Sequence, residues 1–133
     1  MKRIIIDTNF LLIPLQFKVD IFSEIDRICH FNYELSIFDK SIDELKKIIE
    51  KQSGKDKKAA QFALKLVKLK RVNIIKSEQN DVDSLILENL DKDTIAATQD
   101  INLKKELLAK GASVIILRQK KYLQLIESNT LVS

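Results

Sequence analysis

Apolar residues in this chain fall into short runs of strand length, separated by stretches in which they recur every three or four positions. Five runs are rich in branched side chains and predict strands, at residues 4–6, 33–38, 72–75, 94–98 and 113–117. The intervening period is that of amphipathic helices. Strands that alternate with helices predict a three-layer α/β/α sandwich around a central, mainly parallel five-stranded sheet.

The first two runs differ in a way that predicts their places in the sheet. Ile4 to Ile6 are apolar without alternation, which suits a strand covered on both faces. Residues 33–38 alternate between apolar and polar side chains, which indicates a strand with one more exposed face. We therefore expect residues 4–6 to be buried and residues 33–38 to lie near an edge.

Local signals also predict where some of the helices begin. Asp20 and Asp100 are natural N-caps of the helices that follow them. The apolar segment 10–17 is interrupted by Pro14 and predicts a short helix followed by a turn. Arg118 to Tyr122 read as a basic segment after the fifth strand.

The length and composition are those of one ordinary globular domain. The chain has 133 residues, of which 45% are hydrophobic and 32% are charged. We expect residues 1–127 to form the domain and residues 128–133 to be a frayed tail. Asp7 and Pro14 interrupt the first apolar stretch, which argues against a signal peptide, and no apolar run approaches the roughly 18 residues of a membrane span. A cytoplasmic location is expected.

Cysteine and histidine are nearly absent, which limits the chemistry. Cys29 and His30 are the only residues of their types, so an internal disulfide, a zinc tetrad and a pair of histidine ligands within one chain are excluded. Cys29 falls on the apolar stripe of its predicted helix and should be core, with His30 on the flank. Any metal must therefore be held by oxygen. The formal charge of +4 permits a nucleic-acid partner without requiring one.

Four acidic residues each follow a predicted strand: Asp7, Glu44, Asp83 and Asp100. In a parallel sheet with right-handed crossovers, all strand-to-helix junctions lie at one edge, so these acids are expected to face one cleft. Each also has a local explanation. Asp7 and Asp100 suit N-caps, Asp83 lies in a first helical turn, and Glu44 completes a capping box with Ser41. Both interpretations stay open at this point.

The helical period distinguishes Glu44 from its neighbour. An apolar stripe through Ile42, Leu45 and Ile48 places Glu44 beside the buried face and turns Asp43 further toward water. Glu44 is therefore the carboxylate expected to point into the molecule.

If the acids converge, their mutual repulsion raises some of their pKa values and destabilises the fold unless a cation compensates. Carboxylate oxygens without cysteine or histidine favour Mg²⁺ or Mn²⁺ over zinc. Metals held in this way commonly act on phosphates. Convergence would thus predict a metal-dependent reaction at a phosphate group.

The chain resembles the PIN-domain family in four segments that occur in the family's order and span nearly the whole chain. They are Asp7-Thr8-Asn9-Phe10, Ile42-Asp43-Glu44-Leu45, Val82-Asp83-Ser84-Leu85-Ile86 and Ile95-Ala96-Ala97-Thr98-Gln99-Asp100. Residues 103–104 and 114–122 are more similar to small archaeal PIN proteins that resemble rRNA-processing nucleases than to the VapC toxins.

The resemblance implies a PIN-like fold and a Mg²⁺- or Mn²⁺-dependent endoribonuclease, with a role in rRNA processing. It implies that the acidic metal ligands and catalytic residues are Asp7, Glu44, Asp83 and Asp100, supported by Thr8, Asn9 and Thr98. Relatives often carry a second acid where this chain has Ser84, and an asparagine where it has Gln99. Asp81 is a candidate to replace the missing acid, although it also suits a helix cap.

The expected substrate is rRNA or another single-stranded RNA, and basic residues must attract it to an acidic cleft. The candidates for phosphate contacts are Lys68, Lys104, Arg118, Lys120 and Lys121. Tyr122 is a candidate for stacking on a base, although packing explains it equally well.

Three other functions are compatible with the sequence. The chain is alternatively a PIN-like RNA-binding or assembly module with little or no catalysis, or a toxin-type RNase. A receiver-type phosphoacceptor domain has a similar architecture, but it requires an acid pair after the first strand, where this chain has Asp7 alone. A homodimer is also a candidate, since Phe10, Phe17 and Phe22 would suit an apolar patch, though core burial explains them as well.

Overall fold

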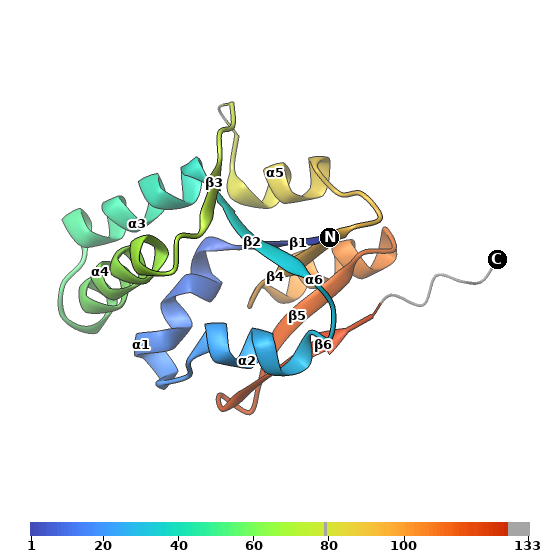
Figure 1. The fold of residues 1–133 in the computed structure, drawn as a ribbon. Coiled ribbons are helices and arrows are strands. Elements are labelled where there is room, and N and C mark those ends of the chain that lie inside the picture. Colours follow the sequence, from blue (N-terminus) through green and yellow to red (C-terminus); the bar gives the residue numbers. More distant parts are fainter. Residues whose placement is uncertain (79, 128–133) are drawn as a thin grey trace.

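The computed structural model describes residues 1–78 and 80–127, whose strands form a single sheet. The six strands of this part of the chain have the order β3-β2-β1-β4-β5-β6 (Figure 1). They are β1 (Lys2–Ile6), β2 (Tyr33–Phe38), β3 (Asn73–Ile75), β4 (Thr94–Ala97), β5 (Ser113–Arg118) and β6 (Tyr122–Ile126). The first five run parallel, and β6 runs antiparallel to β5.

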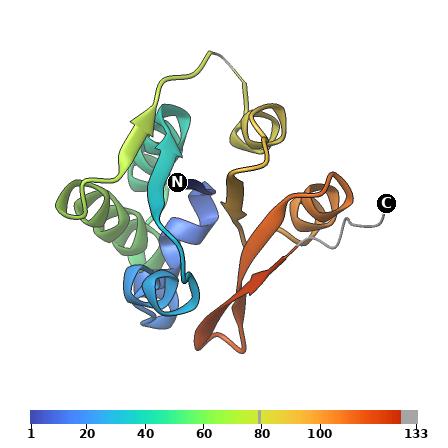
Figure 2. The same cartoon turned by 45° about the vertical axis from the view of Figure 1, so that its right-hand side comes forward.

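Helices cover both faces of the sheet. A 3-10 helix η1 (Thr8–Leu12) and four α-helices pack on one face, and two further α-helices pack on the other (Figure 2). The first group is α1 (Ile13–Phe17), α2 (Ile21–Ile28), α3 (Asp39–Lys51) and α4 (Gly54–Leu69), and the second is α5 (Val82–Glu88) and α6 (Ile101–Ala109). The predicted three-layer α/β/α sandwich with a mainly parallel sheet is confirmed.

Strand β1 shows why the fold needs two helical layers. Ile4 and Ile6 belong to the core on the side of η1 to α4, whereas Ile5 belongs to the core on the side of α5 and α6. All three are fully buried. The prediction from the unbroken apolar run is therefore confirmed, and β2 lies one strand in from the edge, as its alternation predicts.

The path of the chain reverses between β1 and β4. From β1 the chain builds the sheet outward through β2 and β3, and it then returns to place β4 on the other side of β1. The backbone N–H of Asp7 donates to the carbonyl oxygen of Ala97 at 2.9 Å, so the ends of β1 and β4 adjoin. In open α/β sheets, ligands bind in the crevice beyond such a switch point.

The predicted count of five strands was wrong, because residues 118–122 form a hairpin that leads into β6. Lys121 N donates to Arg118 O at 2.9 Å, and the central residues Gln119 and Lys120 have φ of 50° and 55°. Turns with positive φ at both central positions usually carry Asn or Gly, so Gln-Lys gives no turn signal in the sequence.

Helix α2 holds the outer strand of this hairpin. The backbone N–H of Leu123 donates to Glu24 Oε1 at 2.9 Å, and Arg27 Nη2 donates to the carbonyl oxygen of Leu123 at 3.3 Å. Glu24 and Arg27 also pair with each other. Both backbone groups of Leu123 are thereby satisfied, which fixes the position of the hairpin.

Several local predictions can be compared with these elements. Asp20 caps α2, Cys29 is buried and His30 is exposed, as predicted. Pro14 does not interrupt a helix but lies in the first turn of α1, where its missing N–H is tolerated. The predicted tail, residues 128–133, lies outside the described residues, and the domain limits 1–127 stay a prediction.

The phenylalanines considered for an apolar surface patch do not form one. Phe10 is fully buried and Phe22 is 9% exposed, so both belong to the core. Phe17 is half-buried and packs against the same core. Core burial therefore explains Phe10 and Phe22, Phe17 keeps part of its ring exposed, and pairing of two copies stays a prediction. Among the described residues, no helix combines the length and the apolar character needed to cross a membrane.

Candidate active site

Asp7 lies where β1 ends and η1 begins, and its carboxylate is held from two sides. Oδ1 accepts from the backbone N–H of Thr8 at 2.9 Å, and Oδ2 accepts from the hydroxyl of Thr98 at 2.7 Å. The residue is only 4% exposed. Asp7 does cap η1, so the capping interpretation is right, but the bond from Thr98 comes from a loop 91 residues away.

The surroundings of Asp7 disfavour its charge. Burial, together with the negative charges of Asp83 and Glu44, raises its pKa to about 6, even though the bonds from Thr98 and Thr8 lower it. Near neutral pH the site thus keeps a buried carboxylate that is repelled by two others. A cation near Asp7 would relieve this repulsion.

The capping-box interpretation of Glu44 was wrong. Helix α3 begins at Asp39, so Ser41 lies inside the helix and Phe38 occupies the N-cap without a side-chain bond. Ser41 and Thr8 instead join their hydroxyls at 2.8 Å, and Thr8 Oγ1 donates to Glu44 Oε1. Since the single hydroxyl proton of Thr8 goes to Glu44, Ser41 must donate to Thr8. Glu44 is therefore held in position by residues of two segments.

Asp7 and Glu44 share a pocket of about 440 Å³ with Asp83. We call it the acidic pocket, and its polar lining is completed by Thr8, Asn9 and Lys47. Asp83 lies in the first turn of α5. Burial raises its pKa, and so do the negative charges of Asp100, Asp81, Glu44 and Glu106. Asp83 is therefore close enough to the other acids to be affected by their charges.

Asp81 and Ser84 have a structural role. Asp81 caps α5 by accepting from the backbone N–H of Ser84 at 2.7 Å. The helix-cap interpretation of Asp81 is confirmed. Asp43, the neighbour of Glu44, is exposed, as the helical period predicts.

Asp100 is both a helix cap and a neighbour of Asp7. Its Oδ1 accepts from the backbone N–H groups of Asn102 and Leu103 at 2.9 and 3.1 Å, which caps α6 as predicted. Its own backbone N–H donates to Thr98 Oγ1 at 3.0 Å, and the Thr98 hydroxyl donates in turn to Asp7. Thr98 therefore connects the two acids that follow β1 and β4.

Asn9 and Gln99 join the same two loops. Gln99 Nε2 donates to the carbonyl oxygen of Asn9 at 2.8 Å, and the backbone N–H of Gln99 donates to Asn9 Oδ1 at 3.4 Å. These two hydrogen bonds hold the loop after β1 against the loop after β4.

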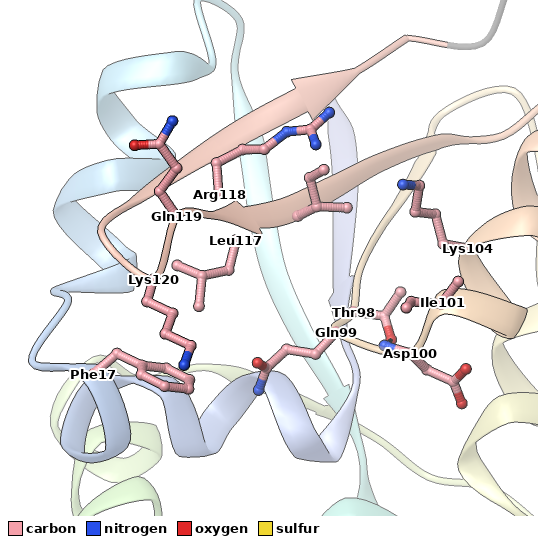
Figure 3. Close-up of a pocket in the computed structure, with 11 residues that line it drawn as sticks. Phe17, Thr98, Gln99, Asp100, Ile101, Lys104, Leu117, Arg118, Gln119 and Lys120 are labelled. Carbon is pink, nitrogen blue, oxygen red and sulfur yellow. Dashed lines mark hydrogen bonds between the residues drawn. The ribbon is translucent and has the colours of Figure 1, made fainter.

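A second pocket of about 420 Å³ is lined by Thr98 and Asp100, and Thr98 donates to Asp7 of the first pocket. We call it the hairpin pocket, because the β5–β6 hairpin forms one of its walls with Leu117, Arg118, Gln119 and Lys120 (Figure 3). Three of the basic residues predicted to bind RNA line it: Lys104, Arg118 and Lys120. Lys68, Lys121 and Tyr122 are exposed but line neither pocket.

Lys47 and Phe17 are among the pocket residues that the sequence analysis missed. Lys47 lines the acidic pocket together with Asp7, Glu44 and Asp83. It follows Glu44 by three residues in a helix, and this spacing places both on one face, so a signal existed. Phe17 lines the hairpin pocket. No local pattern indicated this, because α1 and the hairpin are about one hundred residues apart in the sequence.

The donor set suits a hard divalent cation. Asp7, Glu44, Asp83 and Asp100 offer only oxygen, and burial together with the charges of neighbouring carboxylates raises the pKa values of Asp7 and Asp83. Within residues 1–78 and 80–127, however, no three acidic, histidine or cysteine side chains are arranged closely enough to hold an ion as they lie. The acids are gathered at one edge without forming a finished coordination shell.

Comparison with known proteins shows which family this chain is similar to. Residues 4–120 match the model of the PIN-like domain family. Over 127 residues the chain is 30% identical to ribonuclease VapC4 of Methanocaldococcus jannaschii, which covers 94% of this chain and 97% of that protein. The structure titled as that of the PIN domain endonuclease Utp24 superposes with a TM-score of 0.77 at 23% identity, covering 94% of this chain and 91% of that one. The resemblance inferred from the four sequence segments is confirmed.

Proposed function

Because this chain belongs to the PIN-like domain family, we propose that it is an endoribonuclease that hydrolyses RNA phosphodiester bonds with Mg²⁺ or Mn²⁺. One observation carries the proposal. Carboxylates from four separate segments gather at the switch point of the sheet, where the buried Asp7 is repelled by Asp83 and Glu44. Helix capping explains single acids but not this repulsion.

Asp7, Glu44, Asp83 and Asp100 are the residues that would hold the ion. When bound, a divalent ion neutralises phosphate charge, lowers the pKa of a coordinated water and stabilises the leaving oxygen. Thr98 and Thr8 fix the carboxylates of Asp7 and Glu44 through the hydrogen bonds described above. These bonds keep the acids oriented while the substrate arrives.

Basic residues offset the field of the acids. Lys47 stands in the acidic pocket, and Lys104, Arg118 and Lys120 surround the hairpin pocket beside Asp100. Cations on both sides of the acids attract the RNA backbone and supply a salt-dependent part of its affinity. Lys68, Lys121 and Tyr122 would contact only portions of the RNA outside these pockets.

RNA is the proposed substrate for two reasons. The relative from Methanocaldococcus jannaschii is named a ribonuclease, and cations flank the acids on both sides. The resemblance of the four sequence segments further suggests the kind of RNA. We propose ribosomal RNA or another single-stranded RNA as the substrate, with a role in rRNA processing.

The proposal is tested by cleavage of a fluorescent single-stranded RNA with Mn²⁺. We expect the wild type to cut the RNA, chelation to stop it, and Asp7→Asn to reduce the rate by about 10³-fold, since a lost ion forfeits several kcal/mol of transition-state stabilisation. The matched control is Asp43→Asn, which removes an equal charge from an exposed position on the same helix as Glu44.

Two results would contradict the proposal. Undiminished cleavage by Asp7→Asn would remove the acidic pocket from the reaction. Binding of the RNA by the wild type, with no cleavage under any divalent ion, would instead favour a PIN-like RNA-binding module.

A further inference from the structure

We propose that the hairpin pocket binds one unstacked nucleotide of single-stranded RNA beside the cleavage position, with its base against Phe17 and Leu117 and its phosphate near Lys104 and Arg118. The inference rests on the proposed function, because it places this nucleotide next to the bond that is cut. It goes further by assigning a base-binding role to residues that carry no charge.

The size and lining of the pocket suit a nucleotide. Its volume of about 420 Å³ lies within the roughly 300–1,000 Å³ of small-molecule sites. Phe17, Ile101 and Leu117 give it an apolar surface, and Ile101 is 67% exposed although it directly follows Asp100. An apolar recess of this kind receives a base only if the base has left its stack, which favours single strands over duplexes.

The cations are arranged beside this apolar surface. Lys104 and Arg118 lie on one side of the pocket, and Phe17 and Lys120 lie on the other (Figure 3). Arg118 Nε donates to Gln124 Oε1 at 2.6 Å across the hairpin, which fixes the direction of its side chain. A nucleotide between the two sides would meet positive charge at its phosphate and carbon surface at its base.

Phe17 already accommodates a charged group over its ring. Lys120 Nζ lies 5.8 Å from the ring centroid, so a face of the ring is accessible to polar groups. Beside it, Gln99 donates its carboxamide nitrogen to Asn9 O, and this bond fixes the orientation of the side chain. Gln99 thus presents its oxygen in a constant direction, as an acceptor for a base N–H.

A hydrogen bond links the lining of this pocket to that of the acidic pocket. Thr98 and Asp100 line the hairpin pocket, and Thr98 donates directly to Asp7, which lines the acidic pocket. Lys104 follows Asp100 by one helical turn, and both line the hairpin pocket. A strand that crosses Asp7 and Asp100 would therefore place its next nucleotide here, while Lys47 attracts the strand on the opposite side.

Binding without cleavage isolates this pocket from the reaction. Fluorescence anisotropy in EDTA measures the affinity of the full chain for 5′-labelled single-stranded oligo(rA), oligo(rC) and oligo(rU), and for a duplex of equal length. We expect single strands to bind more tightly than the duplex. Phe17→Ala should weaken this binding by about 5- to 100-fold, the effect of a lost base–aromatic stack.

Two variants distinguish stacking from damage to the fold. Phe17→Trp keeps an aromatic surface and should restore at least the affinity of the wild type. Phe62→Ala removes an equally large ring from an exposed position on α4 and should change the affinity by less than about twofold. Lys104→Ala should lower the slope of log affinity against log salt by about 0.7, as one lost phosphate contact requires on a single strand, and the exposed Lys57→Ala should not.

The outcomes separate this inference from the proposed function. Binding that depends on Phe17, in a protein that cuts no RNA, would support the nucleotide pocket and overturn the nuclease. Cleavage and binding that are both unchanged in Phe17→Ala would overturn the pocket and leave the nuclease standing. Equal losses in Phe17→Ala and Phe17→Trp, or a duplex bound as tightly as the single strand, would also overturn the pocket.

Discussion

The acidic pocket and the hairpin pocket are linked by the hydrogen bond from Thr98 to Asp7, yet they hold their charges in opposite ways. Asp7 is 4% exposed, and its carboxylate accepts two hydrogen bonds at the end of a central strand. Arg118 and Lys120 extend from an exposed turn at the edge of the sheet. Buried charge is thus placed where the backbone is most constrained, and solvated charge where it is least constrained.

The difference has an energetic consequence. A buried carboxylate near other carboxylates destabilises the fold, and only a bound cation compensates for it. Solvated cations cost little, and their effect appears when a polyanion arrives. We therefore expect neutralisation of the buried Asp7 to raise stability and lower cleavage. Substitution of the basic residues Lys104, Arg118 and Lys120 should lower RNA affinity with little change in stability.

Asp100 gives the largest expected contrast, because it combines a cap with a proposed metal ligand. Asp100→Asn keeps a good N-cap, so the free energy of unfolding should change by less than about 0.5 kcal/mol. RNA cleavage should fall by about 10²- to 10³-fold, because a ligand charge is lost. Asp100→Ala should lose the same activity and also about 1 kcal/mol of stability. Urea unfolding and cleavage rates are measured on the same samples.

If Asp100→Asn cleaves RNA as fast as the wild type and only Asp100→Ala loses activity, then Asp100 serves as a helix cap and not as a metal ligand. The proposed ion would then be held by the residues of the acidic pocket alone, without Asp100.

The next largest expected effect is that of Asp7→Asn on the free energy of unfolding. The folded-state pKa of Asp7, about 6, lies above the ordinary value of 3.8. The stabilising contribution of the protonated carboxyl group is therefore fully present below about pH 4 and is lost as the pH rises through 6. This shift in pKa corresponds to a difference of about 3 kcal/mol in the free energy of unfolding. In EDTA at pH 7, Asp7→Asn should therefore be more stable than the wild type by about 2–3 kcal/mol, and the advantage should vanish near pH 4.

Chemical denaturation at both pH values measures this advantage. Arg118→Ala, in the hairpin pocket, is the matched control and should stay within about 0.5 kcal/mol of the wild type at each pH. An Asp7→Asn protein that is less stable than the wild type at pH 7 would show that the carboxylate is needed by the fold.

Thr8 gives the smallest effect and tests the network that fixes Glu44. Thr8→Val keeps the shape but removes the hydroxyl, which leaves the buried Ser41 without its partner. We expect a loss of about 1–2 kcal/mol. Adding Ser41→Ala should recover part of that loss, because the orphaned hydroxyl is gone, so the double variant should be less destabilised than the sum of the single variants. Strict additivity would mean that the two hydroxyls act independently.

Patterns along the chain were sufficient for the central part of the fold. The unbroken run Ile4 to Ile6 predicts a strand buried on both faces, and the structure confirms it. The acids that follow the strands predict one shared edge, because parallel strands end on the same side. Asp7, Glu44 and Asp83 line one pocket, and Asp100 is joined to Asp7 through Thr98.

Two of the three failures come from contacts between distant segments, and the third comes from an unusual turn. The Ser41 to Glu44 spacing fits a capping box, but Thr8 provides a better partner for both residues. The sixth strand was missed because Gln119 and Lys120 adopt positive φ without the residues that usually do so. Phe17 lines the hairpin pocket because the tertiary fold brings Lys120 of the hairpin to 5.8 Å from the centroid of its ring.

The central claim is that the four acids form one cation site, and Mn²⁺ binding tests it most directly. Electron paramagnetic resonance measures the free Mn²⁺ during titration of the wild type, Asp7→Asn and the exposed control Asp43→Asn, each without RNA. We predict that the wild type and Asp43→Asn bind Mn²⁺ equally and that Asp7→Asn loses the site. No Mn²⁺ bound by the wild type, or equal binding by all three proteins, would contradict the account.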